Sequence, residues 1–170
     1  DGFRIKIDRL DKSTINGSVE VEFLFSANKG ENLMPLRKIA SGGEVSRVML
    51  AFKELFAELD YISTLIFDEI DAGIGGETLL KIAEALNLIS LNKQVICVTH
   101  SPIIAAFADK INSVRKVESD GRILVNIYPL LKEVEIIDEL SRMQGGSDNF
   151  ITAREQSIEM LKFANNSKKV

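Results

Sequence analysis

The N-terminal part of the chain alternates apolar and polar residues. The segments FRIKID (3–8) and SVEVEFLF (18–25) each place an apolar residue at every second position. A period of two residues is typical of a half-buried strand. The turn-rich segment DKSTING (11–17) between them predicts a hairpin, and residues 26–35 are expected to form a loop.

From Ser41 onward the pattern changes to the period of an amphipathic helix. Apolar residues recur three and four positions apart, at Val45, Val48, Met49, Phe52, Leu55, Phe56 and Leu59. This spacing predicts a helix of about five turns. The same spacing, with helix-start and helix-stop residues at the ends, predicts further helices over 75–90, 101–109, 133–144 and 149–164.

Two short apolar runs lie between these helices, STLIFDE (63–69) and KQVICVTH (93–100). Both are typical of buried strands, and their alternation with helices predicts an α/β layer with parallel strands. Asp120-Gly121, between two further apolar segments, predicts a second hairpin. We therefore expect an α/β fold with a mixed, largely parallel sheet and flanking helices.

The expected fold occupies a single domain over residues 1–164, and the polar residues 165–170 are expected to form a flexible tail. Gly145-Gly146 is expected to end the helix over 133–144. The chain begins at Asp1 rather than Met and enters a strand pattern directly, so we expect it to be a segment of a longer protein.

Composition excludes several classes of function. The net charge of −4 argues against a free-standing basic nucleic-acid binder. No apolar run approaches the length of a membrane span, and the start shows no signal-peptide pattern. Cys97 is the only cysteine and His100 the only histidine, which excludes an intrachain disulfide and argues against a structural zinc site.

Three acids, Asp68, Glu69 and Asp71, come at the end of the first buried strand. Ligands of open α/β sheets bind at the carboxyl ends of strands. A carboxylate there can hold Mg²⁺, and a second acid can polarise an attacking water. The alternative is that these acids only solvate the strand end or cap a turn, and the residues alone leave both interpretations open.

His100 follows the second buried strand, again at its carboxyl end. It can donate a hydrogen bond to a phosphate oxygen or to a nearby carboxylate. Taken alone, the pattern favours the simpler interpretation of a partly buried histidine at the start of the next helix, for which Ser101 is the expected N-cap.

The segment SGGE opens the helix that begins after Ser41. Ser41 followed three residues later by Glu44 is the signature of a capping box. Gly42 and Gly43 add exposed N–H groups at the positive end of the helix, which suits a phosphate. The phosphate loop G-x-x-x-x-G-K-[ST] is absent, because no Gly-Lys pair occurs in the chain.

The order of these segments carries a resemblance that none of them carries alone. SGGEVSR, then TLIFDEID, then VTH resemble the signature motif, the Walker B acids with the D-loop, and the switch histidine of an ABC-type ATPase head. Without a phosphate loop the chain looks like the C-terminal lobe of a split, SMC-like head. The segments EFLFSANKGE, IFDEIDAGIGG and ELSRMQGG resemble the bacterial DNA repair family RecN in particular.

This resemblance implies roles for individual residues. Asp68 would bind the Mg²⁺ of ATP, Glu69 would be the general base for the hydrolytic water, and His100 would contact the γ-phosphate. Asp71 would lie in the D-loop at the seam between two heads.

The helix start would act on a second head. Ser41, Gly42 and Gly43 would reach the γ-phosphate of a nucleotide bound to the partner, and Arg47 would lie near that interface. The resemblance thus implies ATP and Mg²⁺ as cofactors.

The implied partners are an N-terminal lobe carrying the phosphate loop, a second copy of the head in an ATP-dependent homodimer, and DNA, with no membrane. The implied location is the bacterial cytoplasm, in association with the nucleoid.

The chain by itself would be inactive, and an apolar edge would be exposed where the other lobe packs. The alternatives are a head lobe of another SMC, Rad50 or RecF-like protein, or a non-catalytic α/β interaction module.

Overall fold

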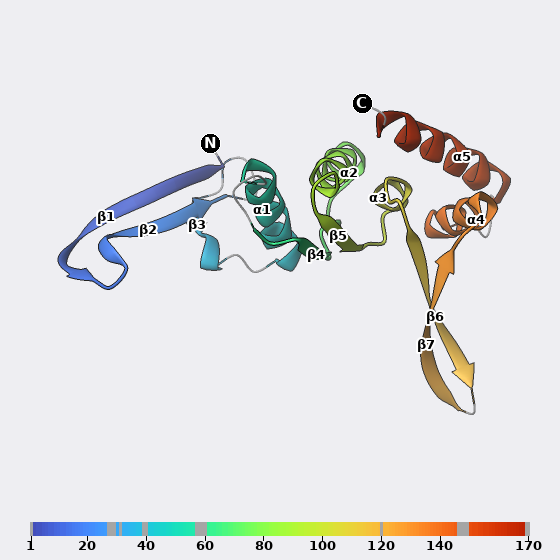
Figure 1. Ribbon diagram of the computed structural model, residues 1–170, viewed down its shortest axis with the longest axis horizontal. Coiled ribbons are helices and arrows are strands. Elements are labelled where there is room, and N and C mark those ends of the chain that lie inside the picture. Colours follow the sequence, from blue (N-terminus) through green and yellow to red (C-terminus); the bar gives the residue numbers. More distant parts are fainter. Residues whose placement is uncertain are drawn as a thin grey trace.

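The structure is a computed structural model, and it describes residues 2–26, 30, 32–38, 41–56, 61–119, 121–145 and 150–168. Asp120 and Gly146, predicted to lie at a hairpin tip and at a helix end, and Leu59, predicted in a helix, fall outside these residues. The elements are arranged along one long axis (Figure 1): a hairpin at one end, a central group of helices around two strands, and a helix pair with a second hairpin at the other end.

The N-terminal hairpin consists of β1 (Phe3–Thr14) and β2 (Gly17–Phe25), which pair antiparallel, and the short β3 (Met34–Pro35) extends the sheet beside β2. The predicted hairpin is confirmed, but most of the predicted turn DKSTING is strand. The turn is short because the Thr14 hydroxyl accepts a hydrogen bond from Asn16 N–H and donates one to the Gly17 carbonyl.

The central group contains α1 (Gly42–Leu55), β4 (Thr64–Asp68), α2 (Gly76–Ser90), β5 (Gln94–Val98) and α3 (Pro102–Ala106). β4 and β5 pair in parallel, as predicted. The helices pack on one face of this ladder and form the core with it. The buried side chains that this group contributes to the core are those of Leu50, Leu65, Phe67, Ile70, Ile82, Ala83, Leu86, Ile89, Ile104, Ala105, Ala106 and Phe107, and Leu140 and Ala164 of the last two helices join them.

Helix α1 is shorter than predicted within the described residues. It ends at Leu55, and the Phe56 N–H closes it on the Phe52 carbonyl. Leu55 and Phe56 are exposed. Neither side chain belongs to the buried core, so the apolar spacing of the sequence did not locate the end of the helix.

The two central strands are buried on one face only, so the prediction of fully buried strands was wrong. The side chains of Ile66, Ile96 and Val98 are 70%, 44% and 56% exposed. The helices cover the opposite face, where Leu65 and Phe67 lie. An apolar face of β4 and β5 therefore points to solvent in the described part of the chain.

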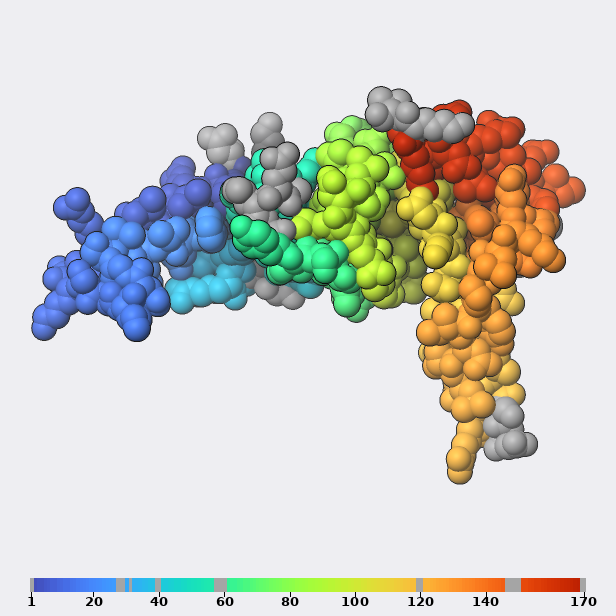
Figure 2. Space-filling view, viewed as in Figure 1, coloured from blue at the N-terminus to red at the C-terminus, as the bar shows by residue number. Residues whose placement is uncertain are grey.

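A second hairpin, β6 (Ile111–Ser119) and β7 (Arg122–Leu130), confirms the predicted one and stands out from the body (Figure 2). A single turn of 3₁₀-helix, η1 (Leu36–Lys38), precedes α1.

The predicted α/β class is confirmed, but the described strands form three small sheets, of which only the β4–β5 sheet is parallel. None of the described helices combines the length and the apolarity that crossing a membrane requires.

The last two helices are α4 (Glu133–Met143) and α5 (Phe150–Ser167). Helix α5 continues to Ser167, into the residues predicted to form a polar tail, and the Lys168 amino group then contacts the Ala108 carbonyl and the Asp109 carboxylate. These contacts tie the end of α5 to the loop after α3.

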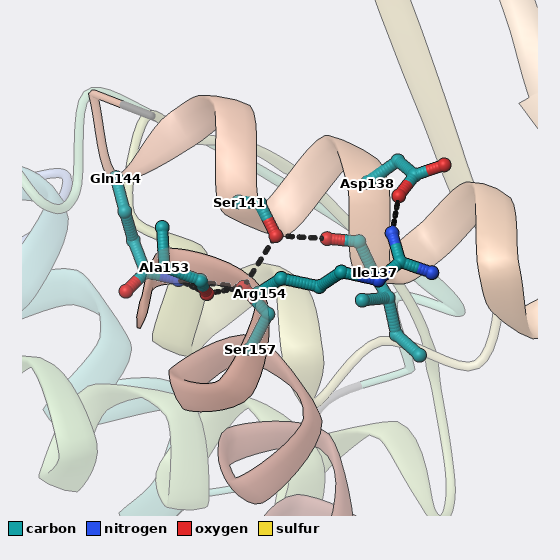
Figure 3. A network of polar contacts seen from close by, with 7 residues as sticks. All are labelled: Ile137, Asp138, Ser141, Gln144, Ala153, Arg154 and Ser157. Carbon is teal, nitrogen blue, oxygen red and sulfur yellow. Dashed lines mark hydrogen bonds and ion pairs between the residues drawn. The ribbon is translucent and has the colours of Figure 1, made fainter. Parts of the chain in front are cut away.

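A buried polar network joins α4 to α5 (Figure 3). The hydroxyls of Ser141 and Ser157, both fully buried, lie 3.1 Å apart, and each donates to the carbonyl four residues earlier in its own helix. The Gln144 side chain donates to the Ser157 hydroxyl at 2.7 Å. Because these groups are removed from water, the network stabilises this helix pairing only as long as every member keeps a partner.

Substitution of Ser157 is expected to destabilise the α4–α5 pair. Ser157→Ala removes the nearest acceptor of Gln144 and the contact with the Ser141 hydroxyl, at a cost of about 1 kcal/mol in the free energy of unfolding. Urea unfolding followed by circular dichroism measures this cost.

Ser167→Ala is the matched control, because the Ser167 hydroxyl makes the same bond to the carbonyl four residues earlier but lies near the exposed end of α5. Its effect should stay within about 0.5 kcal/mol. Equal effects of the two substitutions would contradict a specific role for the buried network.

Candidate functional site

The parallel register of β4 and β5 brings two candidate segments to the same edge. Asp68 lies opposite Val98 in the ladder, so Glu69 and His100 both follow the carboxyl ends of adjacent strands. The side chains of Asp68, Glu69 and His100 are exposed. Each of these residues was predicted to follow a strand end, and the register places the two strand ends at one edge.

Glu69 has a left-handed backbone, with φ of 56°, and is the only described non-glycine residue with positive φ. A residue with a Cβ pays about 1–2 kcal/mol for this conformation. Such residues are concentrated at functional sites, where the surrounding contacts hold them in place. At Glu69 the strand turns sharply, and the Glu69 carbonyl accepts a hydrogen bond from Ala72 N–H.

The N-terminus of α1 lies against this turn. Gly43 is buried there, and a Cβ atom on it would lie 2.8 Å from the Glu69 carbonyl oxygen. The Ser46 hydroxyl donates to the Asp68 carbonyl at 3.2 Å. The helix start and the acidic turn therefore form a single packed unit.

Arg47 fixes the same turn further along. Its guanidinium donates to the carbonyls of Ile70 and Ala72, at 3.2 and 3.1 Å. Arg47 was predicted to lie near an interface between heads, and the structure shows it holding the backbone of its own chain. Gly43 and Arg47 are four residues apart and so share one helix face, a spacing that could have indicated this contact.

The predicted capping box at Ser41 and Glu44 is wrong. Ser41 occupies the N-cap with extended backbone angles, but its side chain makes no capping hydrogen bond. Ser41 and Gly42 are exposed, so solvent can replace that bond, and the positive end of the helix faces outward. Of the three residues predicted to reach a phosphate, Ser41 and Gly42 are accessible and Gly43 is buried.

The expected cap at Ser101 is also missing. Its hydroxyl is buried and has no hydrogen-bond partner among the described residues. Its backbone N–H instead donates to the Thr99 hydroxyl at 2.9 Å. Thr99 was not identified from the sequence, since a single threonine after a strand gives no distinct signal.

Asp71 links the acidic turn to the segment that carries His100. Its carboxylate accepts a hydrogen bond from the Thr99 hydroxyl at 2.6 Å and another from the His100 backbone N–H at 2.7 Å. Partial burial raises the pKa of Asp71, but the hydrogen bonds from Thr99 and His100 outweigh burial and leave the pKa below its usual value.

The field of the acids reaches the neighbouring strand. Burial, and then the charges of Asp71 and Asp68, raise the pKa of the Cys97 thiol to about 11. Cys97 is therefore a protonated, unreactive thiol near neutral pH. The edge beside it favours a cation.

The carboxylates at this edge can bind Mg²⁺ only together with other ligands. The described residues contain no group of three or more metal-binding side chains. Mg²⁺ needs few protein ligands, because it keeps several waters and takes one or two carboxylates together with substrate phosphates. An exposed carboxylate at a strand end, such as Asp68, meets that requirement.

No protein-family model matches the chain. Among curated proteins, it is 46% identical to the DNA repair protein RecN of Treponema pallidum over 146 residues, which make up 86% of the chain and 25% of that protein. It is 41% identical to RecN of Bacillus subtilis over 148 residues, or 87% of the chain and 26% of that protein. The chain spans about a quarter of the length of the curated relatives it matches.

Solved structures of Smc head domains share the fold. A head domain with a coiled coil and joint from Pyrococcus yayanosii aligns with a TM-score of 0.58 at 23% identity, covering 84% of this chain and 26% of that one. A Pyrococcus furiosus head domain, with an extended coiled coil and bound to the C-terminal domain of ScpA, aligns with a TM-score of 0.51 at 27% identity, covering 82% and 34%.

Gly43 and Gly42 should respond differently to the same substitution. A methyl group at Gly43 meets the Glu69 carbonyl oxygen at 2.8 Å, whereas the nearest atom to one at Gly42 is a Glu69 carboxylate oxygen at 3.6 Å, an ordinary contact. We expect Gly43→Ala to cost about 1–3 kcal/mol and Gly42→Ala to change stability by about 0.5 kcal/mol or less. Denaturant unfolding of both variants measures the difference, and equal stabilities would argue against the close packing.

The stability contribution of Asp71 should depend on pH. Because its folded-state pKa is depressed, the contribution is complete above the unfolded value of about 3.9 and is lost as pH falls through the folded value. The gap in unfolding free energy between the wild type and Asp71→Asn should thus shrink between about pH 5 and about pH 2. Urea unfolding at several pH values tests this, with the exposed Asp109→Asn as control, and a gap that widens in acid would contradict it.

Proposed function

Since the chain is related to the RecN proteins over about a quarter of their length and has the fold of Smc head domains, we propose that it is the C-terminal lobe of an SMC-like ATPase head acting in DNA repair. The observation that carries the proposal is the meeting of three segments at one edge: the carboxyl end of β4, the carboxyl end of β5, and the N-terminus of α1. Phosphoryl transfer needs charge stabilisation and positioning at such an edge more than covalent chemistry.

In this proposal Asp68 holds the Mg²⁺ of ATP, which neutralises charge on the phosphates when bound. Glu69 accepts a proton from the attacking water, because the turn at this residue directs its exposed carboxylate away from the core. The His100 side chain, exposed at the next strand end, donates a hydrogen bond to a phosphate oxygen. Asp71 was predicted to lie at the seam between heads, and we propose that it belongs to this ATP site.

We further propose that the exposed start of α1 acts on a nucleotide held by a second head. Ser41 and Gly42 point outward at the positive end of the helix, which suits a phosphate. Gly43 serves this role indirectly, since it lets the helix approach Glu69 closely. The complete protein would then form an ATP-dependent homodimer.

The exposed apolar face of β4 and β5 supports a second lobe. Ile66, Ile96 and Val98 form a row of apolar side chains on a parallel ladder. Parallel strands normally have both faces covered. We propose that the lobe with the phosphate loop packs there, and that the chain alone neither binds ATP tightly nor hydrolyses it.

Action on DNA and a bacterial cytoplasmic, nucleoid-associated location are proposed from the RecN relatives. A head lobe of another SMC, Rad50 or RecF-like protein would share the same site. The segments FSANKGE and SRMQGG favour RecN among these alternatives, and the relatives that match 86% and 90% of the chain are RecN proteins.

Replacing Glu69 should separate binding from turnover in the full-length protein. Glu69→Gln keeps the shape of the side chain but removes the proton acceptor. We expect kcat to fall by about 10²-fold or more, as for loss of a general base, while ATP still drives dimerisation. Phosphate release and size-exclusion chromatography with Mg-ATP measure the two properties.

Glu77→Gln is the matched control, because Glu77 is an exposed acid at the start of α2 that pairs only with Lys81 among the described residues. Ser41→Arg addresses the non-catalytic alternative, since it crowds the start of α1 and should abolish ATP-dependent dimerisation. Full turnover by Glu69→Gln would remove Glu69 from the role of base, and unchanged dimerisation of Ser41→Arg would favour the interaction module.

A further inference from the structure

We propose that Asp71 is a positioning residue that holds His100 from within the same chain, rather than a group that acts across a seam between heads. The proposal rests on the proposed function for its catalytic consequence. Its structural part depends only on contacts inside this chain. Asp71 and the segment 99–101 come from different strand ends, and one carboxylate joins them.

The carboxylate of Asp71 is already engaged. One of its oxygens accepts both the Thr99 hydroxyl, at 2.6 Å, and the His100 backbone N–H, at 2.7 Å. Thr99 in turn accepts the Ser101 N–H. Asp71 therefore orders three consecutive residues of the loop that follows β5, and the side chain that carries out this role is only partly exposed.

The imidazole of His100 remains exposed while its backbone is held. A catalytic group works best when its support is rigid and its functional atoms face the ligand. The two bonds to Asp71 are charge-assisted, a class about twice as strong as neutral hydrogen bonds. These bonds limit the positions that the imidazole can take, but they leave its nitrogen atoms free to bind a ligand.

The other end of this connection is also fixed. Arg47 of α1 donates to the carbonyls of Ile70 and Ala72, the residues on either side of Asp71. Hydrogen bonds from Arg47 thus hold the turn 69–72, and Asp71 within that turn holds the His100 loop.

The test uses the fact that His100 is the only histidine. In this chain, hydrogen exchange of the His100 amide is measured by NMR for the wild type, Asp71→Asn and Asp71→Ala. Loss of the charge-assisted bond should speed exchange by about 10- to 100-fold in Asp71→Ala, with a smaller effect in Asp71→Asn, whose amide oxygen still accepts. Asp109→Asn, which removes an exposed carboxylate paired with Lys168, should leave the amide unchanged.

The catalytic part is read in the full-length protein. Asp71→Ala should lower kcat by about tenfold or more and leave KM within about threefold, and Asp71→Asn should restore part of kcat. Unchanged exchange at His100 in Asp71→Ala overturns the positioning role, and unchanged kcat overturns its catalytic consequence. Absence of ATP turnover in the full-length wild type would instead overturn the proposed function. The exchange measurement in this chain would still show whether Asp71 holds the His100 backbone.

Discussion

The parallel pairing of β4 with β5 is the constraint on which the candidate site depends. The ladder aligns Asp68 with Val98, so the residues that follow each strand emerge at one edge. A slip of one residue in β4 would turn Leu65 and Phe67 away from the core and place Ile66 and Asp68 on the core face. The burial of these two side chains in the core therefore also fixes the position of the acids and, through the pairing with β5, of His100.

A second constraint is the turn that follows β4. Glu69 adopts a strained left-handed backbone, and its neighbours hold that conformation from two sides. The helix α1 presses against it through Gly43 and bonds the turn through Arg47, while Asp71 bonds the loop after β5. Because these contacts involve backbone carbonyls and N–H groups, the side chains of Glu69 and His100 are left exposed for a ligand.

The sequence predicted the end of β4 well, because a short apolar run followed by acids indicates both the strand and the residue at which it ends. It also predicted the helix faces, as Ile82, Leu86 and Ile89 of α2 show. It did not predict the neighbours of Gly43, since a glycine in a helix start has the same local signature whether a carbonyl or solvent lies beside it. The missing cap at Ser41 has a related cause: local spacing permits the bond, but an exposed hydroxyl can exchange it for water. The exposure of Ile66 could not be predicted either. An apolar run indicates that both faces of a strand are covered, but it does not show whether the covering residues belong to the same chain.

The charges around the described site fit the proposed metal-bound phosphate. Partial burial, and then the charges of Asp71 and Asp68, raise the pKa of the Cys97 thiol, so the negative field of the acids reaches the end of β5. Arg47, the basic residue that contacts this turn, donates to carbonyls, so its bonds fix the backbone rather than pair with the acids. Next to the acidic turn, the exposed Ser41 and Gly42 lie at the start of α1, which is the positive end of a helix dipole. In the proposed function, the acids of one head bind a metal ion, and the phosphate bound to that ion faces the helix start of a second head.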